Sequence, residues 1–252
     1  MDLGLKGKKV ILTGGSRGLG RAALDLFAAE GCDVAFFSRD PAQVAETAAS
    51  LERHGGRVIG SAFSLDDNDA YKAWLEKAAE ELGGVDIFVH NVSASGAGVG
   101  SDWNATLQLD IMGAVIGVQA LEPFLEKSDA ASVVFMSSTA AVETFLSANA
   151  FNALKAALIT HAKQLSQVLG PKGIRVNVIT PGPITFPGGN WEKIKAANPD
   201  LHESIRGKMV TGRFGTAEEV AKSIVFVASP ASSNTTGANL VVDGGFTKRV
   251  QF

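Results

Sequence analysis

The stretch "KKVILTGGSRGLGRAALDLF", residues 8–27, carries the strongest indication of how this chain folds. An apolar run with β-branched residues leads into a glycine-rich loop and then into a segment with helical periodicity. Glycine has no Cβ atom, so the backbone of such a loop can turn sharply and approach a phosphate at the N-terminus of the helix. We therefore predict a strand over residues 8–13, a phosphate-binding loop over residues 13–20 and a helix over residues 21–31.

Strand-like and helix-like segments alternate along most of the chain. The short apolar runs cover residues 8–13, 33–38, 57–63, 85–90, 132–137 and 174–179. Longer amphipathic segments separate them, at residues 21–31, 41–56, 68–84, within 101–127 and around Lys155. This alternation predicts βαβ units, and hence an α/β fold of the Rossmann type: a doubly wound parallel sheet with helices on both faces.

One connection differs from the others because it is long and rich in proline and glycine. It begins with "PGPITFPGGNW", residues 181–191, directly after the sixth apolar run. We predict an irregular segment here, which acts either as a mobile lid or as a plain structural loop.

Length and composition limit the function classes that fit. The 252 residues, with 46% hydrophobic and 19% charged side chains, suit a single domain over residues 1–252 with a large core. The net charge of -3 gives no general attraction to nucleic acid or to an anionic membrane, although a local basic pocket remains open. We therefore expect a small-molecule partner, no nucleic acid, no membrane and no bound metal.

The compartment is predicted from cysteine usage and from the first residues. Cys32 is the single cysteine, so it cannot form an internal disulfide. The start "MDLGLKGKKV" lacks the apolar core of a signal peptide, and no run is long and apolar enough to span a bilayer. These features favour a reducing, cytoplasmic location.

The end of the second predicted strand bears on the choice of nucleotide. A NAD-binding fold carries an acid here for the ribose 2′-hydroxyl, but this chain has "SRD", residues 38–40. Arg39 can pair with a 2′-phosphate through its planar guanidinium, Ser38 can add a hydroxyl, and Arg17 of the glycine loop can approach the same group. The pattern favours NADP over NAD; two solvated surface arginines are the alternative.

With this glycine loop and strand pattern, the sequence resembles the short-chain dehydrogenase/reductase family over nearly its whole length. The family's Thr-Gly, three residues, Gly, one residue, Gly pattern matches Thr13, Gly14, Gly18 and Gly20. Further matches are Asn91, the "MSS" of residues 136–138, Lys155, "VNVITPGPI" at 176–184, "RFGTAEEVA" at 213–221 and "VVDGG" at 241–245.

The resemblance implies one domain with seven parallel strands and an intact nucleotide site for NADP(H). By this resemblance Asn91 lies beside the cofactor, Lys155 binds the nicotinamide ribose, and Ile184 lines the nicotinamide, which the backbone at Pro181 and Gly182 also approaches. The expected cofactor-binding residues are Thr13, Gly14, Ser16, Arg17, Gly18, Leu19, Gly20, Ser38, Arg39, Ser64, Asn91, Lys155, Pro181, Gly182 and Ile184. Ser64 stands where the family has an Asp that contacts the adenine, so this contact is expected to differ.

Two family catalytic positions are substituted. Family members use an Asn, a Ser, a Tyr and a Lys, and Ser138 and Lys155 match the serine and the lysine. Phe151 stands at the tyrosine position, and Asp110 stands at the asparagine position. Phenylalanine has no proton to donate, and a positioned general acid contributes about 10²- to 10⁴-fold to rate, so the tyrosine mechanism is absent. The expected catalytic residues are Ser138, Phe151, Lys155 and Asp110.

Roles for Asp110 and its neighbours follow from charge. Asp110 could pair with Lys155, pass a proton through water, or hydrogen-bond between helices. The sequence "HNVS", residues 90–93, replaces the family's Asn-Asn-Ala-Gly, and His90 is read as a buried structural residue or as a proton carrier. Glu143 and Thr144 either contact substrate or belong to a solvated loop.

Three functions agree with these residues. The first is an NADP-dependent oxidoreductase with a non-standard site, acting on a small carbonyl, imine or activated alkene. The others are a non-redox lyase or cyclase on the same scaffold, and a non-catalytic NADP(H)-binding sensor. The resemblance also implies a homo-oligomer, a dimer or a tetramer, paired through the apolar helix segments 112–121 and 153–162.

Overall fold

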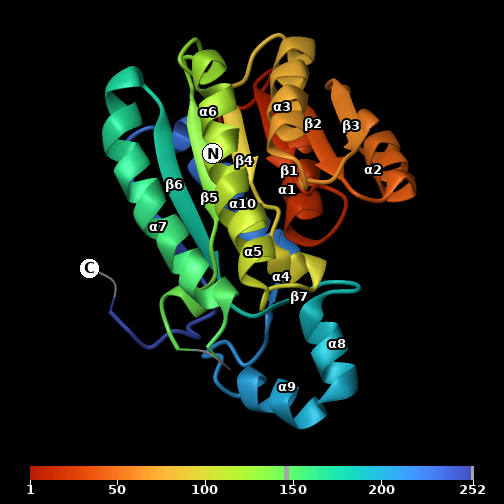
Figure 1. Cartoon of the computed structure of the whole chain (residues 1–252), viewed down its shortest axis with the longest axis vertical. Helices are drawn as coiled ribbons and strands as arrows, with labels where there is room; N and C mark the ends of the chain where they lie inside the picture. The colour runs from red at the N-terminus through yellow and green to blue at the C-terminus, as the bar shows by residue number, and fades with distance from the viewer. Residues whose placement is uncertain (145–147, 251–252) are drawn as a thin grey trace.

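A parallel β-sheet forms the centre of the computed structural model, which describes residues 1–144 and 148–250 (Figure 1). In spatial order its strands are β3 (Val58–Ala62), β2 (Asp33–Ser38), β1 (Lys9–Thr13), β4 (Ile87–His90), β5 (Ser132–Met136), β6 (Arg175–Pro181) and β9 (Asn239–Val242). Each strand of this sheet is parallel to its neighbours. The predicted seven-stranded parallel sheet is thus confirmed for the described residues.

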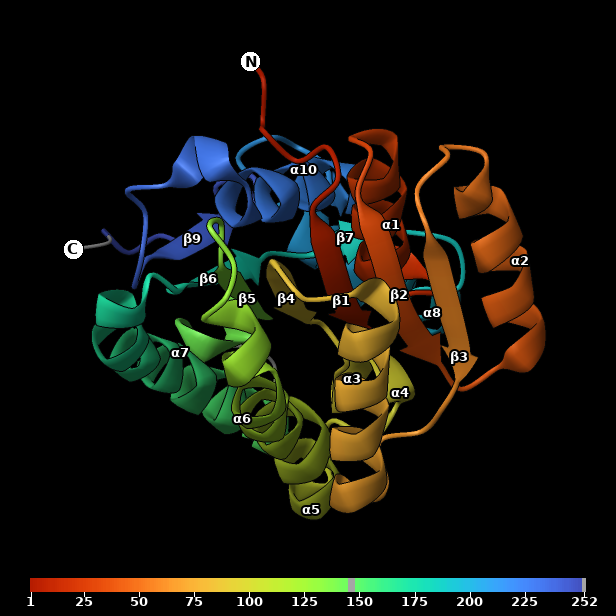
Figure 2. The same cartoon turned by 90° about the horizontal axis from the view of Figure 1, so that it is seen from above.

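Helices cover both faces of this sheet (Figure 2). One face carries α1 (Gly18–Ala29), α2 (Pro41–Glu52) and α10 (Ala217–Ala228), and the other carries α3 (Asn68–Leu82), α6 (Gly113–Leu125) and α7 (Ala150–Leu169). Successive strand side chains point to opposite faces, so Leu12 packs with the first group of helices and Ile11 with the second. Both faces of the five central strands are therefore largely buried, which explains why these strands read as nearly continuous apolar runs.

The strand order creates a crevice at the carboxyl ends of the central strands. From β1 the chain moves outward to β2 and β3, and then returns to place β4 on the opposite side of β1. The connections after β1 and β4 therefore leave in opposite directions, and the space between them is where doubly wound folds bind their ligands.

The helical segment predicted within residues 101–127 is interrupted. It begins as α5 (Trp103–Thr106), continues as the wider turn η1 (Leu107–Met112) and returns to α-helix in α6. In η1 the backbone bonds run from i to i+5, a rare arrangement that is frequent at functional sites.

The segment after β6 is ordered, so the prediction of an irregular connection is wrong there. It contains β7 (Ile184–Thr185), which pairs with β8 (Gly215–Thr216), and the helices α8 (Asn190–Ala197) and α9 (Pro199–Arg206). These helices pack on a small separate core formed by Ile205, Met209, Phe214 and Phe246. Tertiary burial of these side chains, which are far apart in sequence, orders a segment whose local sequence favours turns.

Short elements complete the fold: α4 (Ala94–Ala97), η2 (Thr139–Ala141), η3 (Gly170–Lys172) and η4 (Pro230–Ser232). Within the described ranges no helix has the length and apolar character needed to cross a membrane.

Candidate active site

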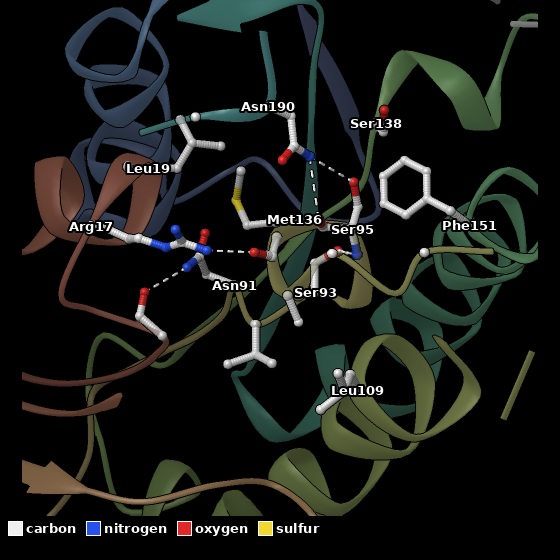
Figure 3. Close-up of a pocket in the computed structure, with 18 of the residues that line it drawn as sticks. Arg17, Leu19, Asn91, Ser93, Ser95, Leu109, Met136, Ser138, Phe151 and Asn190 are labelled. Carbon is white, nitrogen blue, oxygen red and sulfur yellow. Dashed lines mark hydrogen bonds between the residues drawn. The ribbon is translucent and has the colours of Figure 1, made fainter. Parts of the chain in front are cut away.

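A cavity of about 730 Å³ opens at the carboxyl ends of the central strands (Figure 3). The loop after β1 and the residues following β2 and β3 line one part, which we call the cofactor-loop end. Ser138, Phe151 and Lys155 line the other part, which we call the lysine end. The segment of residues 181–194 borders both ends.

Glycine is required in the loop after β1 by backbone geometry and by space. Gly14 and Gly18 have φ angles of +77° and +57°, in the left-handed region. A Cβ atom on Gly18 would lie 2.8 Å from the Phe186 ring, and one on Gly20 would lie 2.1 Å from the Gly14 carbonyl oxygen. The residues present therefore leave a backbone cradle that larger side chains would fill.

The first turn of α1 faces this cradle with free donors. Within the described residues no side chain caps α1, whereas Asp40, Asp67, Asn149 and Thr216 cap α2, α3, α7 and α10. The first N–H groups of a helix need acceptors, and the helix dipole favours an anion at this position. This site fits the pyrophosphate of a dinucleotide.

Asn91 and Thr13 hold the loop in place through hydrogen bonds. The Asn91 side-chain amide donates to the carbonyl oxygens of Thr13 and Gly14, at 3.1 and 2.9 Å. The Thr13 hydroxyl accepts from the backbone N–H groups of Asn91 and Val92, at 2.9 and 3.1 Å. Of the described residues, neither Thr13 nor Gly20 lines the cavity: Thr13 supports the loop through its hydrogen bonds, and Gly20 leaves room for the Gly14 carbonyl oxygen.

At the cofactor-loop end, most of the expected side chains do line the cavity. Gly14, Ser16, Arg17, Gly18, Leu19, Ser38, Arg39, Ser64 and Asn91 are all part of its wall. Arg39 is exposed there, and the Ser16 and Ser38 hydroxyl oxygens are 2.7 Å apart. The neighbouring acid, Asp40, uses its carboxylate to accept the first N–H groups of α2. Asp66 also lines the cavity, although no motif singled it out.

Lys155 is the charged centre of the lysine end. It is only 2% exposed, and α7 brings its ammonium 2.8 Å from a carboxylate oxygen of Asp110. The ammonium also donates to the Met136 carbonyl oxygen at 2.5 Å and lies 5.7 Å from the centre of the Phe151 ring. The predicted pairing of Asp110 with Lys155 is therefore confirmed.

Asp110 reaches this position from the wide turn η1 and is fully buried. Its Oδ2 accepts the backbone N–H of Ala94 at 2.9 Å. Its Oδ1 makes the contact with Lys155, but within the described part of the chain this contact lacks the direction of a hydrogen bond. The two residues thus attract each other mainly through charge, in surroundings where an unpaired ion would be costly.

Ser138 and Phe151 complete the lysine end (Figure 3). Ser138 follows β5, and its hydroxyl oxygen accepts the Ala140 N–H at 3.2 Å, which leaves the hydroxyl proton for another acceptor. Phe151 lies in the first turn of α7, where its backbone N–H donates to the Gly100 carbonyl oxygen at 3.0 Å. The ring lines the cavity beside the Lys155 ammonium.

The other candidate residues lie outside the cavity wall. His90 is fully buried, and it is not among the described residues that line the cavity. Glu143 accepts the backbone N–H of Lys248 at 2.7 Å and so holds the C-terminal segment. Glu143 and Thr144 are likewise missing from the wall that residues 1–144 and 148–250 form.

Polar residues that sequence reasoning did not identify border the lysine end. The Asn190 amide donates to the backbone oxygen and the hydroxyl of Ser95, at 3.2 and 3.3 Å, and so connects α8 with α4 (Figure 3). Arg17 donates to the Gly96 carbonyl oxygen at 2.5 Å from the other side. Ser93 was noted only as a departure from the family pattern, and no local motif distinguished Asn190.

Comparisons with known proteins agree with this geometry. The family model described as "Enoyl-(Acyl carrier protein) reductase" matches residues 14–247. The chain is 39% identical over 257 residues to an isoepoxydon dehydrogenase of Penicillium expansum, covering 100% of this chain and 99% of that protein. It is 31% identical to a 3beta-hydroxysteroid dehydrogenase of Eggerthella lenta, covering 96% and 95%.

A solved structure of similar shape contains a nucleotide. The L-sorbose reductase of Gluconobacter frateurii, complexed with NADPH and L-sorbose, superposes with a TM-score of 0.91 at 29% identity, covering 99% of this chain and 100% of that one. The extent of these matches, together with the glycine loop, Ser138 and Lys155, shows that the chain belongs to the short-chain dehydrogenase/reductase family of oxidoreductases.

Proposed function

We propose that this protein is an NADP(H)-dependent oxidoreductase with a non-standard active site that reduces a small carbonyl, imine or activated alkene. The observation that carries the proposal is the lysine end of the cavity. Ser138 and Lys155 border the same space as the cofactor loop, and Phe151 replaces the phenol beside an ammonium that contacts Asp110 and the Met136 carbonyl.

The choice of NADP rests on the cofactor-loop end. Arg39 is exposed at the cavity, and the adjacent Asp40 carboxylate is engaged by the N-terminus of α2. A guanidinium binds a 2′-phosphate through two parallel N–H groups, whereas a carboxylate would repel it. Arg17 can reach the same phosphate, although its guanidinium now donates to the Gly96 carbonyl.

Lys155 is suited to hold the nicotinamide ribose. Its ammonium has three N–H donors, of which one meets the Met136 carbonyl and one faces Asp110. The third is available for a ribose hydroxyl. When bound, NADPH supplies a hydride to the substrate, and the surrounding residues orient the two reactants.

The proton that accompanies the hydride needs a source other than Phe151. Ser138 can hold a substrate oxygen or nitrogen with its hydroxyl proton, and a water in the cavity that Phe151 lines can deliver a proton from solvent. Such a path is weaker than a positioned phenol. We therefore place the substrate among compounds that need little acid assistance: an iminium ion, an activated alkene, or a carbonyl activated by its own substituents.

A substrate panel tests the proposal. NADPH oxidation at 340 nm and product formation are measured together for cyclic imines, enones, quinones and simple ketones. Turnover is expected with at least one of the first three classes, at rates above those for simple ketones. The matched variant Ser138→Ala, which removes one hydroxyl from a half-buried position, should lower that turnover while leaving NADPH binding unchanged.

Two outcomes contradict the proposal. Product formed without consumption of NADPH would assign the site to non-redox lyase or cyclase chemistry, with the Asp110–Lys155 pair moving protons. Tight NADPH binding with no turnover on any class would instead indicate a nucleotide sensor.

A further inference from the structure

His90 lies at the end of β4 in a pocket shaped to the imidazole. The side chain is fully buried between Phe88 and Phe135, whose ring centres are 6.3 and 6.4 Å from its own. A Cβ atom on Gly113 would lie 2.6 Å from the imidazole Cε1, so a larger residue at the start of α6 would displace the ring. The ring therefore has a fixed place between the sheet and α6.

Both ring nitrogens have polar partners. Nε2 lies 3.0 Å from the Leu109 carbonyl oxygen, and Nδ1 lies 3.3 Å from the Thr13 hydroxyl oxygen. Burial and the nearby Lys155 ammonium lower the pKa of His90 to about 4, so the ring is neutral at pH 7. A carbonyl can only accept, so the ring proton is on Nε2, and Nδ1 accepts the Thr13 hydroxyl proton.

With this assignment, the Thr13 hydroxyl, the imidazole and the Leu109 carbonyl form one connected series of hydrogen bonds. The Thr13 hydroxyl donates to His90 and accepts from the backbone N–H groups of Asn91 and Val92. The imidazole thereby joins the residue that begins the cofactor loop to the Leu109 carbonyl. Leu109 immediately precedes Asp110 within η1.

We propose that His90 is a positioning residue: by holding the Leu109 carbonyl it fixes the wide turn η1, and thereby keeps the Asp110 carboxylate against Lys155. The role of Lys155 toward the nicotinamide ribose rests on the proposed function. The fixing of η1 does not, because it follows from contacts within the protein.

Two substitutions separate the two hydrogen bonds of the ring. The amide nitrogen of glutamine is as many bonds from the backbone as Nε2 and donates as Nε2 does, and the amide oxygen of asparagine is as many bonds away as Nδ1 and accepts as Nδ1 does. His90→Gln should therefore retain the bond to Leu109, whereas His90→Asn should lose it and keep a partner for Thr13. Asparagine is also the residue that the family pattern has at this position.

The first measurement compares two ligands. NADPH reaches Lys155, whereas adenosine 2′,5′-bisphosphate occupies only the cofactor-loop end. His90→Asn should weaken NADPH binding by about twofold to tenfold, the range of one net hydrogen bond, and leave the bisphosphate unchanged. His90→Gln should bind both ligands like the native protein. Equal weakening of both ligands, or no difference between the two variants, would overturn the proposal.

The second measurement needs no nucleotide. Hydrogen exchange of residues 107–113, followed by mass spectrometry on the free protein, should be faster in His90→Asn than in His90→Gln or the native chain. Unchanged exchange in His90→Asn would overturn the proposal directly. If the native protein bound neither nucleotide, the proposed cofactor would be wrong, and the exchange rates would still decide the role of His90.

Discussion

The two ends of the cavity differ in how exposed their polar groups are. At the cofactor-loop end Arg39 is exposed, and in the described chain the first turn of α1 carries no side-chain cap. At the lysine end, buried charged groups contact one another. There, Lys155 meets Asp110 and the Met136 carbonyl, and Asp110 also accepts an N–H from Ala94. The cofactor-loop end thus leaves polar groups open to the cavity, whereas at the lysine end the charged groups have partners within the protein.

The two ends are restricted in different ways. At the cofactor-loop end, the glycine positions are restricted by backbone geometry and by space. At the lysine end the chemistry depends on which groups carry protons. Under the proposed function, Phe151 and Asp110 change the reaction without changing the fold.

The largest effect is expected from breaking the internal pair. Asp110→Ala leaves the Lys155 ammonium buried without its counterion, which typically costs about 3 to 5 kcal/mol of unfolding free energy. Urea unfolding should show this loss. The double variant Asp110→Leu with Lys155→Met should lose less unfolding free energy than the sum of the losses in its two single variants, since two residues in contact are not independent. Strict additivity would mean that the two charges do not interact.

Reversing a charge at the open end should change nucleotide preference. Arg39→Asp replaces attraction of a 2′-phosphate by repulsion, and a charge-assisted contact is worth about 1.5 to 3 kcal/mol. The ratio of NADPH to NADH affinities should therefore fall by about tenfold or more, as measured by fluorescence titration of both nucleotides. Arg53→Asp, an exposed arginine outside the cavity wall of the described residues, is the control. An unchanged ratio in Arg39→Asp would remove this residue from the site.

Acid should destabilise the protein through His90. Its folded pKa of about 4 lies below its ordinary value of 6.5, so between these pH values the unfolded chain binds a proton that the folded chain excludes. Stability from this residue is complete above pH 6.5 and falls as the pH decreases toward 4. The loss between pH 7 and pH 5 should be about 2 kcal/mol.

Urea unfolding at the two pH values, compared between the native chain and His90→Gln, isolates this contribution. The difference between the variants should be small at pH 7 and should widen at pH 5. Parallel curves for the two proteins would show that the imidazole is protonated equally in the folded and unfolded states.

The smallest effect is expected at the border between the two ends. Asn190→Ala removes the hydrogen bonds that connect α8 with Ser95, at a net cost of about 0.5 to 1.5 kcal/mol. NADPH dissociation, followed by stopped-flow fluorescence, should become about twofold to tenfold faster. Lys195→Ala, which changes an exposed lysine of the same helix outside the cavity wall of the described residues, is the control. Equal rates for Asn190→Ala and the native chain would show that this contact does not retain the cofactor.

The sheet and the glycine loop were predictable because their causes are local. Apolar runs, the spacing of glycines and the position of Arg39 can be read along the chain. The interruption at η1 was not predictable, because it depends on the His90 ring from β4 and on Lys155 from α7. The order of α8 and α9 likewise depends on packing against Phe246, more than forty residues away in sequence from Trp191 and Leu201, which pack on the same small core.

One contact of the candidate site was predictable from the sequence because a buried charge needs a partner. A buried lysine needs a partner, and pairing with Lys155 was one of the three roles predicted for Asp110; the structure shows this pair. Spacing alone could not show that Thr13 and Gly20 lie outside the cavity wall of the described residues, because the family pattern does not distinguish residues that touch a ligand from those that hold its site.

We propose that Phe151 and Asp110 together define a proton arrangement different from that of a tyrosine enzyme. The most direct measurement is the rate of NADPH-dependent ketone reduction for the native chain, Phe151→Tyr, Asp110→Asn and the double variant, at equal cofactor saturation. Phe151→Tyr alone should recover only part of the activity, since Asp110 holds the Lys155 ammonium away from the new phenol. The double variant should exceed the product of the two single effects, because groups that share one proton network are not additive. Full ketone reductase activity in Phe151→Tyr alone would contradict the claim, since Asp110 would then have no part in the chemistry.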